Sequence, residues 1–305
     1  MPQSAQIATT ASHEKRRSDG QRKQLARGAP DDRDKPRKCA QKSVKRATMS
    51  IAQYQIGPEQ RPQLHHDPGF ADCIRPATVK DRALYLGWRG FLEAAEAGQK
   101  VPFVPHNDLP DGLAAYRHFL CGRGMARKFS YDRYVANDKA GEITLENAIV
   151  DLQDGIEEIA AQNPYGSGFQ VTGTGIRCDN KSMWSHLFPY PKTENWQKAI
   201  GAHWIWLSAT VGVSRGTPRS FVATMTLHAE DLYNFNPGAQ DVGTSIPDAL
   251  NGPLEESCLG QDYLNVSTLV RVLRWEEADY SWVDNAKRDS PDRAPNDNRR
   301  LRNRM

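Results

Sequence analysis

The most regular pattern of apolar and polar residues lies between residues 203 and 228, and it predicts a β-hairpin. In the first half, apolar residues recur at every second position, at Ile205, Leu207, Ala209, Val211 and Val213. After a turn over 214–219 the alternation resumes at Phe221, Ala223, Met225 and Leu227. Because side chains point alternately to the two faces of a strand, this period of two predicts strands with one buried face. Similar but shorter stretches predict two more strands, over 169–176 and 268–275.

A period of three to four residues predicts the helices. The first runs over 79–97 and stops at Gly98, and the second begins at Asp111 or Gly112 and ends at Gly122. The third has the clearest apolar stripe, formed by Leu145, Ile149, Leu152, Ile156 and Ile159, with Thr144 placed as its N-cap. Its outer face carries Asp151, Asp154, Glu157 and Glu158, which we expect to face solvent. A short helix is predicted over 193–200.

These elements predict an α+β fold, in which a helical N-terminal half packs on an antiparallel sheet that forms an open half-barrel. We expect a disordered basic arm over 1–60 and a connector with one helix over 61–110. The α+β domain that carries the function is expected over 111–277, followed by a disordered tail over 278–305. Both tails are rich in charge and poor in apolar residues, so they bury too little apolar surface to offset the entropy of folding.

The charge of the chain is unevenly distributed. Residues 1–50 contain 13 Lys or Arg against 5 Asp or Glu, a balance of +8, which leaves −5 for the remainder of a chain whose net charge is +3. A basic arm can bind nucleic acid, but this one has no aromatic side chain on which a base could stack, so nucleic acid is not the expected partner. A further hypothesis is that the natural protein starts at Met49, without the arm.

Other sequence features narrow the class of protein. No stretch approaches the roughly 20 consecutive apolar residues of a spanning helix, so no transmembrane segment is expected. The N-terminus has no apolar core of a Sec signal, so a protein that is secreted or delivered to a target-cell periplasm would use a non-Sec route, and the alternative is a cytoplasmic location. The five cysteines are odd in number, widely spaced and without a CxxC pair, so neither a zinc site nor a disulfide framework is expected.

Candidate chemistry is concentrated in residues 228–238, at the end of the second hairpin strand. An acid pair, a phenol and an amide follow one another there, at Glu230, Asp231, Tyr233 and Asn234. Adjacent carboxylates can bind a divalent cation, or their pKa values can separate so that one serves as acid or base. The alternative is a turn that Tyr233 and Phe235 anchor to the core.

Three stretches, in order along the chain, resemble a known family. Residues 114–128 contain a helical pattern that ends in Phe-Leu-Cys-Gly-Arg-Gly, residues 200–203 read Ile-Gly-Ala-His, and residues 231–236 read Asp-Leu-Tyr-Asn-Phe-Asn. Together they resemble the activity domain of the colicin M family, bacteriocins that cleave the peptidoglycan precursor lipid II. The third stretch is similar to the family signature Asp-x-Tyr-Asp-Phe-Asn. The resemblance covers about residues 111–275 and lies in order and spacing more than in identity.

The resemblance implies an antibacterial toxin or effector that hydrolyses the phosphoester of a lipid-linked peptidoglycan precursor, with Mg²⁺ as cofactor and an immunity protein as partner. Carried over to this chain, the catalytic residues would be Asp231, Tyr233 and Asn234, with Asp241 as a substitute base. Glu230 and Asp231 would hold the metal, and Arg127, Arg271 or Arg274 would bind the phosphates.

This chain departs from the family pattern at two places. Asn234 replaces the second Asp of the signature, and Gln240-Asp241 stands where the family has a His-Arg pair. An amide can still donate and accept hydrogen bonds, but it cannot act as a base. The departures therefore motivate an alternative hypothesis, a catalytically inactive binding or interaction domain with the same fold.

Overall fold

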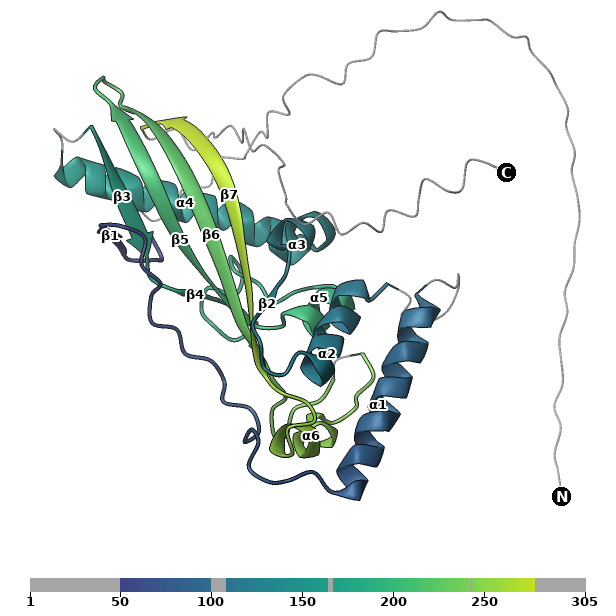
Figure 1. Ribbon diagram of the computed structural model, residues 1–305. Helices are drawn as coiled ribbons and strands as arrows, with labels where there is room; N and C mark the ends of the chain where they lie inside the picture. Colours follow the sequence, from purple (N-terminus) through teal and green to yellow (C-terminus); the bar gives the residue numbers. More distant parts are fainter. Residues whose placement is uncertain (1–49, 100–107, 164–166, 242, 278–305) are drawn as a thin grey trace, which may run out of the picture. The chain divides into compact units, whose positions relative to one another are not determined.

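The structure is a computed structural model that describes residues 50–99, 108–163, 167–241 and 243–277 (Figure 1). The strands are β1 (Tyr54–Ile56), β2 (Arg127–Lys128), β3 (Gly168–Gly173), β4 (Ile176–Cys178), β5 (His203–Ser214), β6 (Ser220–Tyr233) and β7 (Tyr263–Glu276). The helices are α1 (Val79–Gly98), α2 (Pro110–Cys121), α3 (Tyr131–Asn137), α4 (Lys139–Gln162), α5 (Glu194–Ala199) and α6 (Gly252–Glu256), with a 3₁₀ turn η1 (Asp248–Leu250). The predicted α+β class is confirmed.

One open sheet contains all seven strands. Its order is β1-β3-β5-β6-β7-β2, and β4 pairs with the start of β5. All pairs are antiparallel except β2 with β7. The predicted hairpin is β5–β6, with Val211 opposite Ala223 and Leu207 opposite Leu227. The predicted strand over 169–176 is instead split into β3 and β4.

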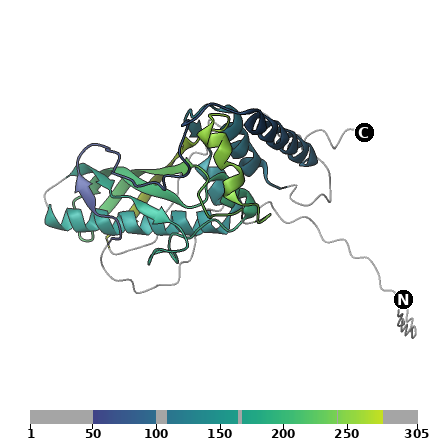
Figure 2. The ribbon, with the colours of Figure 1, turned by 90° about the horizontal axis from the view of Figure 1, so that it is seen from below.

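Helix α4 packs on one face of this sheet (Figure 2). Its apolar stripe is buried against the inward-facing residues of β5, β6 and β7, as the period of the sequence predicts. The N-cap differs from the prediction. Asp138 caps the helix by accepting from the backbone N–H of Ala140 at 2.8 Å, while Thr144 is buried inside the helix. The helix therefore begins six residues earlier than expected.

The N-terminal strand corrects two expectations. Residues 50–60 were assigned to the disordered arm, yet β1 pairs with β3. Asp151 of α4 was expected to face solvent, but it is buried and accepts hydrogen bonds from the backbone of Ile51 and Ala52 and from the Tyr54 hydroxyl. A carboxylate that receives several donors can be buried at little net cost. This acid therefore anchors β1 to α4.

A second apolar cluster lies where α1, α2 and α6 meet the ends of β6 and β7. Its buried members are Leu92, Phe119, Leu120, Leu254 and Tyr263. Helix α1 begins at a capping box in which Thr78 and Asp81 exchange hydrogen bonds. A disulfide joins Cys73 to Cys258 beside α6, although the cysteine spacing did not suggest one. These two cysteines are 185 residues apart in the sequence, so only the fold brings them together.

Several expectations concern residues outside the described part of the chain. They are the disorder of residues 1–49 and 278–305 and the part of the predicted connector over 100–107. Among the described helices, none has a stretch apolar and long enough to cross a bilayer.

Candidate functional site

Strand β6 continues through the segment that carries the candidate chemistry. It was expected to end near His228, but it pairs with β7 as far as Tyr233, so the loop begins at Asn234. Asp231 lies opposite Asn265, and Glu230 lies opposite Trp204 on one side and Val266 on the other. Consecutive residues of a strand point to opposite faces. Glu230 and Asp231, expected as an acid pair, are thus separated by the sheet.

Glu230 is held on the face that residues 57–72 cross, which we call the crossing segment. Its carboxylate accepts hydrogen bonds from Arg61, with Nε at 2.8 Å, and from His66 Nε2 at 2.7 Å. Burial alone would raise the pKa of Glu230, but the hydrogen bonds and charges of Arg61 and His66 outweigh it and lower this pKa. Glu230 is therefore ionised, and its structural role is to bind the crossing segment to the sheet through Arg61 and His66.

Asp231 lies on the other face of the sheet, and its pKa is shifted in the opposite direction from that of Glu230. Asp231 is 9% exposed, and among the described residues no group donates a hydrogen bond to its carboxylate, whose oxygens are not fully closed off from solvent. Burial raises the pKa of Asp231 well above its ordinary value, Asp67 and Glu230 raise it further, and only the charge of Arg177 opposes the rise. A desolvated acid without donors favours its protonated form and can give a proton to a bound molecule.

The neighbouring strand β7 holds a guanidinium through Asn265, the residue opposite Asp231. Asn265, opposite Asp231, is fully buried; its amide donates to the Ala199 carbonyl at 2.9 Å, and its Oδ1 accepts from Arg127 at 3.1 Å. Burial and the neighbouring carboxylates raise the pKa of Tyr233, and the positive charge of Arg127 opposes this rise. Of the three arginines predicted to bind phosphate, Arg127 is therefore the one whose partner Asn265 lies opposite Asp231. The cation whose charge opposes the rise in the pKa of Asp231 is instead Arg177 of β4.

The other two predicted arginines lie far along β7. Arg271 is opposite Met225 and donates to Asp132 at 2.6 Å. Arg274 is exposed and lies on the opposite face of the strand from Asn265. At about 3.3 Å per residue they are roughly 20 and 30 Å from Asn265. The fold thus places these two predicted phosphate-binding arginines far from Asp231.

Tyr233 and Asn234 are fixed by packing and by the crossing segment. The ring of Tyr233 stacks on Tyr263 at 5.0 Å between centroids and belongs to the second apolar cluster. The amide of Asn234 donates to the Asp67 carbonyl at 2.7 Å. Gly69 approaches so closely that an added Cβ would lie 2.8 Å from Asn234 Nδ2. Tyr233 is thus anchored to the core, as the turn interpretation predicts. The buried acid Asp231 lies two residues before it.

Asp241, the expected substitute base, is occupied by its own loop. Its Oδ1 accepts from Thr244, with the backbone N–H at 2.7 Å, and its Oδ2 pairs with Lys198. Burial alone would raise the pKa of Asp241, but Lys198 and Thr244 outweigh it and lower this pKa. Burial and the negative charges of Asp231, Asp241 and Asp248 raise the pKa of the Tyr190 phenol. Tyr190 is therefore a phenol donor that the sequence did not suggest.

Both strand histidines have partners, as a polar residue on a strand commonly does. His203 is buried between Tyr131, whose hydroxyl lies 3.2 Å from Nε2, and the Gly201 carbonyl, 3.1 Å from Nδ1. Burial lowers the pKa of His203 to about 4, so the ring is neutral near pH 7. His228 stacks on Trp206 at 3.6 Å on the opposite face.

The residues present do not fit the Mg²⁺ site that the resemblance implies. Glu230 and Asp231 face opposite sides of the sheet, and both oxygens of Glu230 already accept hydrogen bonds. Over the described ranges, no three or more His, Cys, Asp or Glu side chains are grouped to hold a metal ion. We therefore derive no chemical step through a metal.

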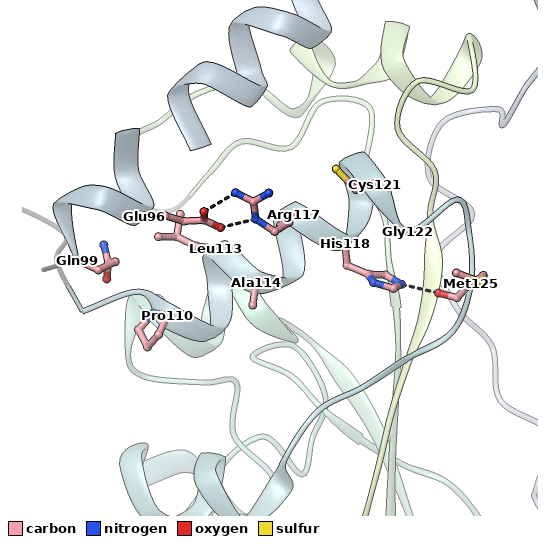
Figure 3. Close-up of a pocket in the computed structure, with 10 residues that line it drawn as sticks. All are labelled: Glu96, Gln99, Pro110, Leu113, Ala114, Arg117, His118, Cys121, Gly122 and Met125. Carbon is pink, nitrogen blue, oxygen red and sulfur yellow. Dashed lines mark hydrogen bonds and ion pairs between the residues drawn. The ribbon is translucent and has the colours of Figure 1, made fainter. Parts of the chain in front are cut away.

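A separate groove lies along α2, facing the end of α1 (Figure 3). Its walls include the ion pair of Glu96 with Arg117, together with Leu113 and the exposed thiol of Cys121. His118 Nε2 closes one end through a 2.6 Å contact to the Met125 carbonyl. None of the predicted site residues lines this groove, so it is distinct from the Asp231 site.

Comparisons with known proteins give one distant likeness. No family model and no curated protein matches this chain. Among solved structures, the chain is similar to "PaeM, a colicin M-like bacteriocin produced by Pseudomonas aeruginosa", with 14% sequence identity and a TM-score of 0.32. The match covers 55% of this chain and 52% of the PaeM chain, about half of each. This is a weak structural resemblance to a bacteriocin.

Proposed function

We propose that this chain is an antibacterial toxin or effector that hydrolyses a lipid-linked peptidoglycan precursor at its lipid–phosphate ester. The observation that carries the proposal is the carboxyl of Asp231, which is buried, raised in pKa and without a hydrogen-bond donor among the described residues. Buried acids without partners are costly for folding and are concentrated at functional sites. The order of motifs that resembles colicin M suggests the substrate class.

The groups around Asp231 suit hydrolysis of a phosphoester. When water adds to phosphorus, the ester bond breaks and the departing prenyl oxygen needs a proton, which a protonated Asp231 can give. Arg127 supplies positive charge for the phosphate oxygens, and the phenol of Tyr190 supplies a donor whose raised pKa keeps it protonated. The products are a prenol and a pyrophosphoryl-sugar.

The test is to incubate the purified chain with lipid II and measure released pyrophosphoryl-sugar, with a known colicin M family member in parallel. The assay is run both with Mg²⁺ and with EDTA, because the metal requirement implied by the resemblance stays a prediction. We expect product from the wild type and a loss of at least about 100-fold in Asp231→Asn. No wild-type product beside an active family member would contradict the proposal.

The second candidate is a binding domain that has lost its chemistry. It is favoured by Asn234 and Asp241, which stand at positions where the family has reactive groups but hold loop contacts in this chain. Expression of the chain in a bacterial periplasm distinguishes the two candidates. Lysis that disappears with Asp231→Asn supports the hydrolase, and lysis that persists unchanged in this variant contradicts it.

A further inference from the structure

Helix α1 has a large apolar face that no described element covers. Its inner side contributes Leu92 to the second apolar cluster, where α1 packs on α2. On its outer side, the exposed fractions are 86% for Val79, 64% for Leu86 and 60% for Phe91. Contiguous exposed apolar side chains of this size mark interaction surfaces on folded proteins.

Two glycines lie in the middle of that outer face. A Cβ built on Gly87 or on Gly90 would meet nothing within 4 Å. Glycine inside a helix is destabilising relative to alanine, and at these two positions nothing in the described structure requires it. Glycines on a helix surface leave a shallow depression that allows a second helix to approach closely.

The outer face is self-complementary about the midpoint of the helix. A two-fold axis placed between residues 88 and 89 brings Gly87 opposite Gly90 of a second copy at the centre of the face, with Leu86 of both copies on one flank and Phe91 of both copies on the other. The same axis brings Ala83 opposite Ala94, and both are exposed. A two-fold interface uses the same surface on both copies, so it requires this kind of symmetry within one helix.

The charges at the rim follow the same symmetry. Arg82 lies in the N-terminal half of α1 and Glu93 in the C-terminal half. In an antiparallel pair, Arg82 of one copy lies beside Glu93 of the other, whereas a parallel pair sets like charges together. Glu93 accepts from Arg89 of its own helix at 3.3 Å and remains 55% exposed, so it has room for a second cation.

We propose that the outer face of α1 is an antiparallel, two-fold interface with a second copy of this chain. A pair of 20-residue helices about 30 Å long buries less than the roughly 800 Å² per partner of a standard interface. The expected dimer is therefore weak, with a Kd in the micromolar range. The proposal goes beyond the proposed function and uses no assay of activity.

Sedimentation velocity of the full chain over about 1 to 200 µM tests the proposal. We expect the wild type to shift from monomer to dimer and Leu86→Asp to stay monomeric, with association at least about tenfold weaker. Leu250→Asp is the matched control, because Leu250 is 46% exposed on η1, and it should dimerise like the wild type. Equal melting curves for both variants would verify that each is folded.

Disulfide cross-linking tests the antiparallel register in a Cys39→Ser and Cys121→Ser background. In the proposed pair, the two Gly87 positions are offset by roughly 5 Å along the axis and the two Ala97 positions by roughly 25 Å. Gly87→Cys should therefore cross-link and Ala97→Cys should not, whereas a parallel pair would cross-link through both.

Three results would overturn the proposal. They are a monomer at every concentration, a dimer that Leu86→Asp leaves intact, and efficient cross-linking through Ala97→Cys. A monomeric wild type that floats with phosphatidylglycerol vesicles, and loses this binding in Leu86→Asp, would also overturn it and assign the face to a lipid surface.

Discussion

The two faces of β6 near its end give adjacent acids opposite environments. Glu230 faces the crossing segment and receives hydrogen bonds from Arg61 and His66, which lower its pKa. Asp231 faces the other way, receives no hydrogen bond from any described residue, and has a pKa raised by burial. One residue of sequence separation thus distinguishes an acid that fastens a segment from an acid able to transfer a proton. The groups around each carboxyl, and not the type of acid, determine the direction of its pKa shift.

The largest effect is expected for the arginine on the Asp231 side. Arg127→Gln should lower the rate of lipid II hydrolysis by roughly 100-fold, because the variant removes the positive charge held beside Asn265. Arg274→Gln is the control, since Arg274 is exposed at the far end of β7. Equal rates for the two variants in the pyrophosphoryl-sugar assay would place the phosphate elsewhere.

On the opposite face, Glu230→Gln should reduce stability and not chemistry. The substitution removes the ionised acceptor of Arg61 and His66, and loss of a buried charge-assisted bond costs about 1–3 kcal/mol. Urea denaturation near pH 7 measures this loss, and Asp231→Asn is the matched comparison, expected to leave stability unchanged or to raise it, because the wild-type acid loses stability as the pH rises above 3.8. An equal loss from both variants would mean that the two acids are equivalent.

The pH dependence of stability should have opposite signs for the two acids. Glu230 has a folded pKa below its ordinary 4.5, so the unfolded chain binds its proton first and the contribution of Glu230 is lost as the pH falls below about 4.5. Asp231 has a folded pKa above its ordinary 3.8, so the folded chain keeps a proton that the unfolded chain releases, and stability is lost as the pH rises from 3.8.

Urea denaturation at a series of pH values separates these contributions. Relative to the wild type, Glu230→Gln should flatten the acid side of the profile, and Asp231→Asn should flatten the decline above pH 3.8. Profiles that change in the same direction would refute the difference in pKa.

The smallest effect is expected at the start of the loop. Asn234→Asp restores the family residue but removes the amide that donates to the Asp67 carbonyl, which should cost about 1 kcal/mol. Gln240→Glu, at an exposed position of the same loop, is the control for added charge. Unchanged stability of Asn234→Asp would show that the contact to the crossing segment contributes little.

The sequence predicts the parts of the fold that depend on local periodicity. The β5–β6 hairpin and the stripe of α4 follow from alternation and helical spacing. Continuing the alternation through Ala229 to Asp231 would also have separated Glu230 from Asp231. The separation was missed because the strand was expected to end near His228.

The crossing segment could not be predicted in this way. It has no regular secondary structure, and Arg61 meets Glu230 across 169 residues of sequence. Asn265 likewise positions Arg127 across 138 residues. Contacts over such separations depend on the tertiary arrangement and leave no local periodic signal, so these members of the site appear only in the structure.

The most direct test of this account is the titration of the Asp231 carboxyl, followed by ¹³C NMR of the folded chain with Asp231→Asn used for assignment. We predict a midpoint well above 3.8 for Asp231, and in the same sample a midpoint below 4.5 for Glu230. A midpoint for Asp231 at or below 3.8 would rule out its proposed role, because the acid would then be ionised and unable to donate a proton.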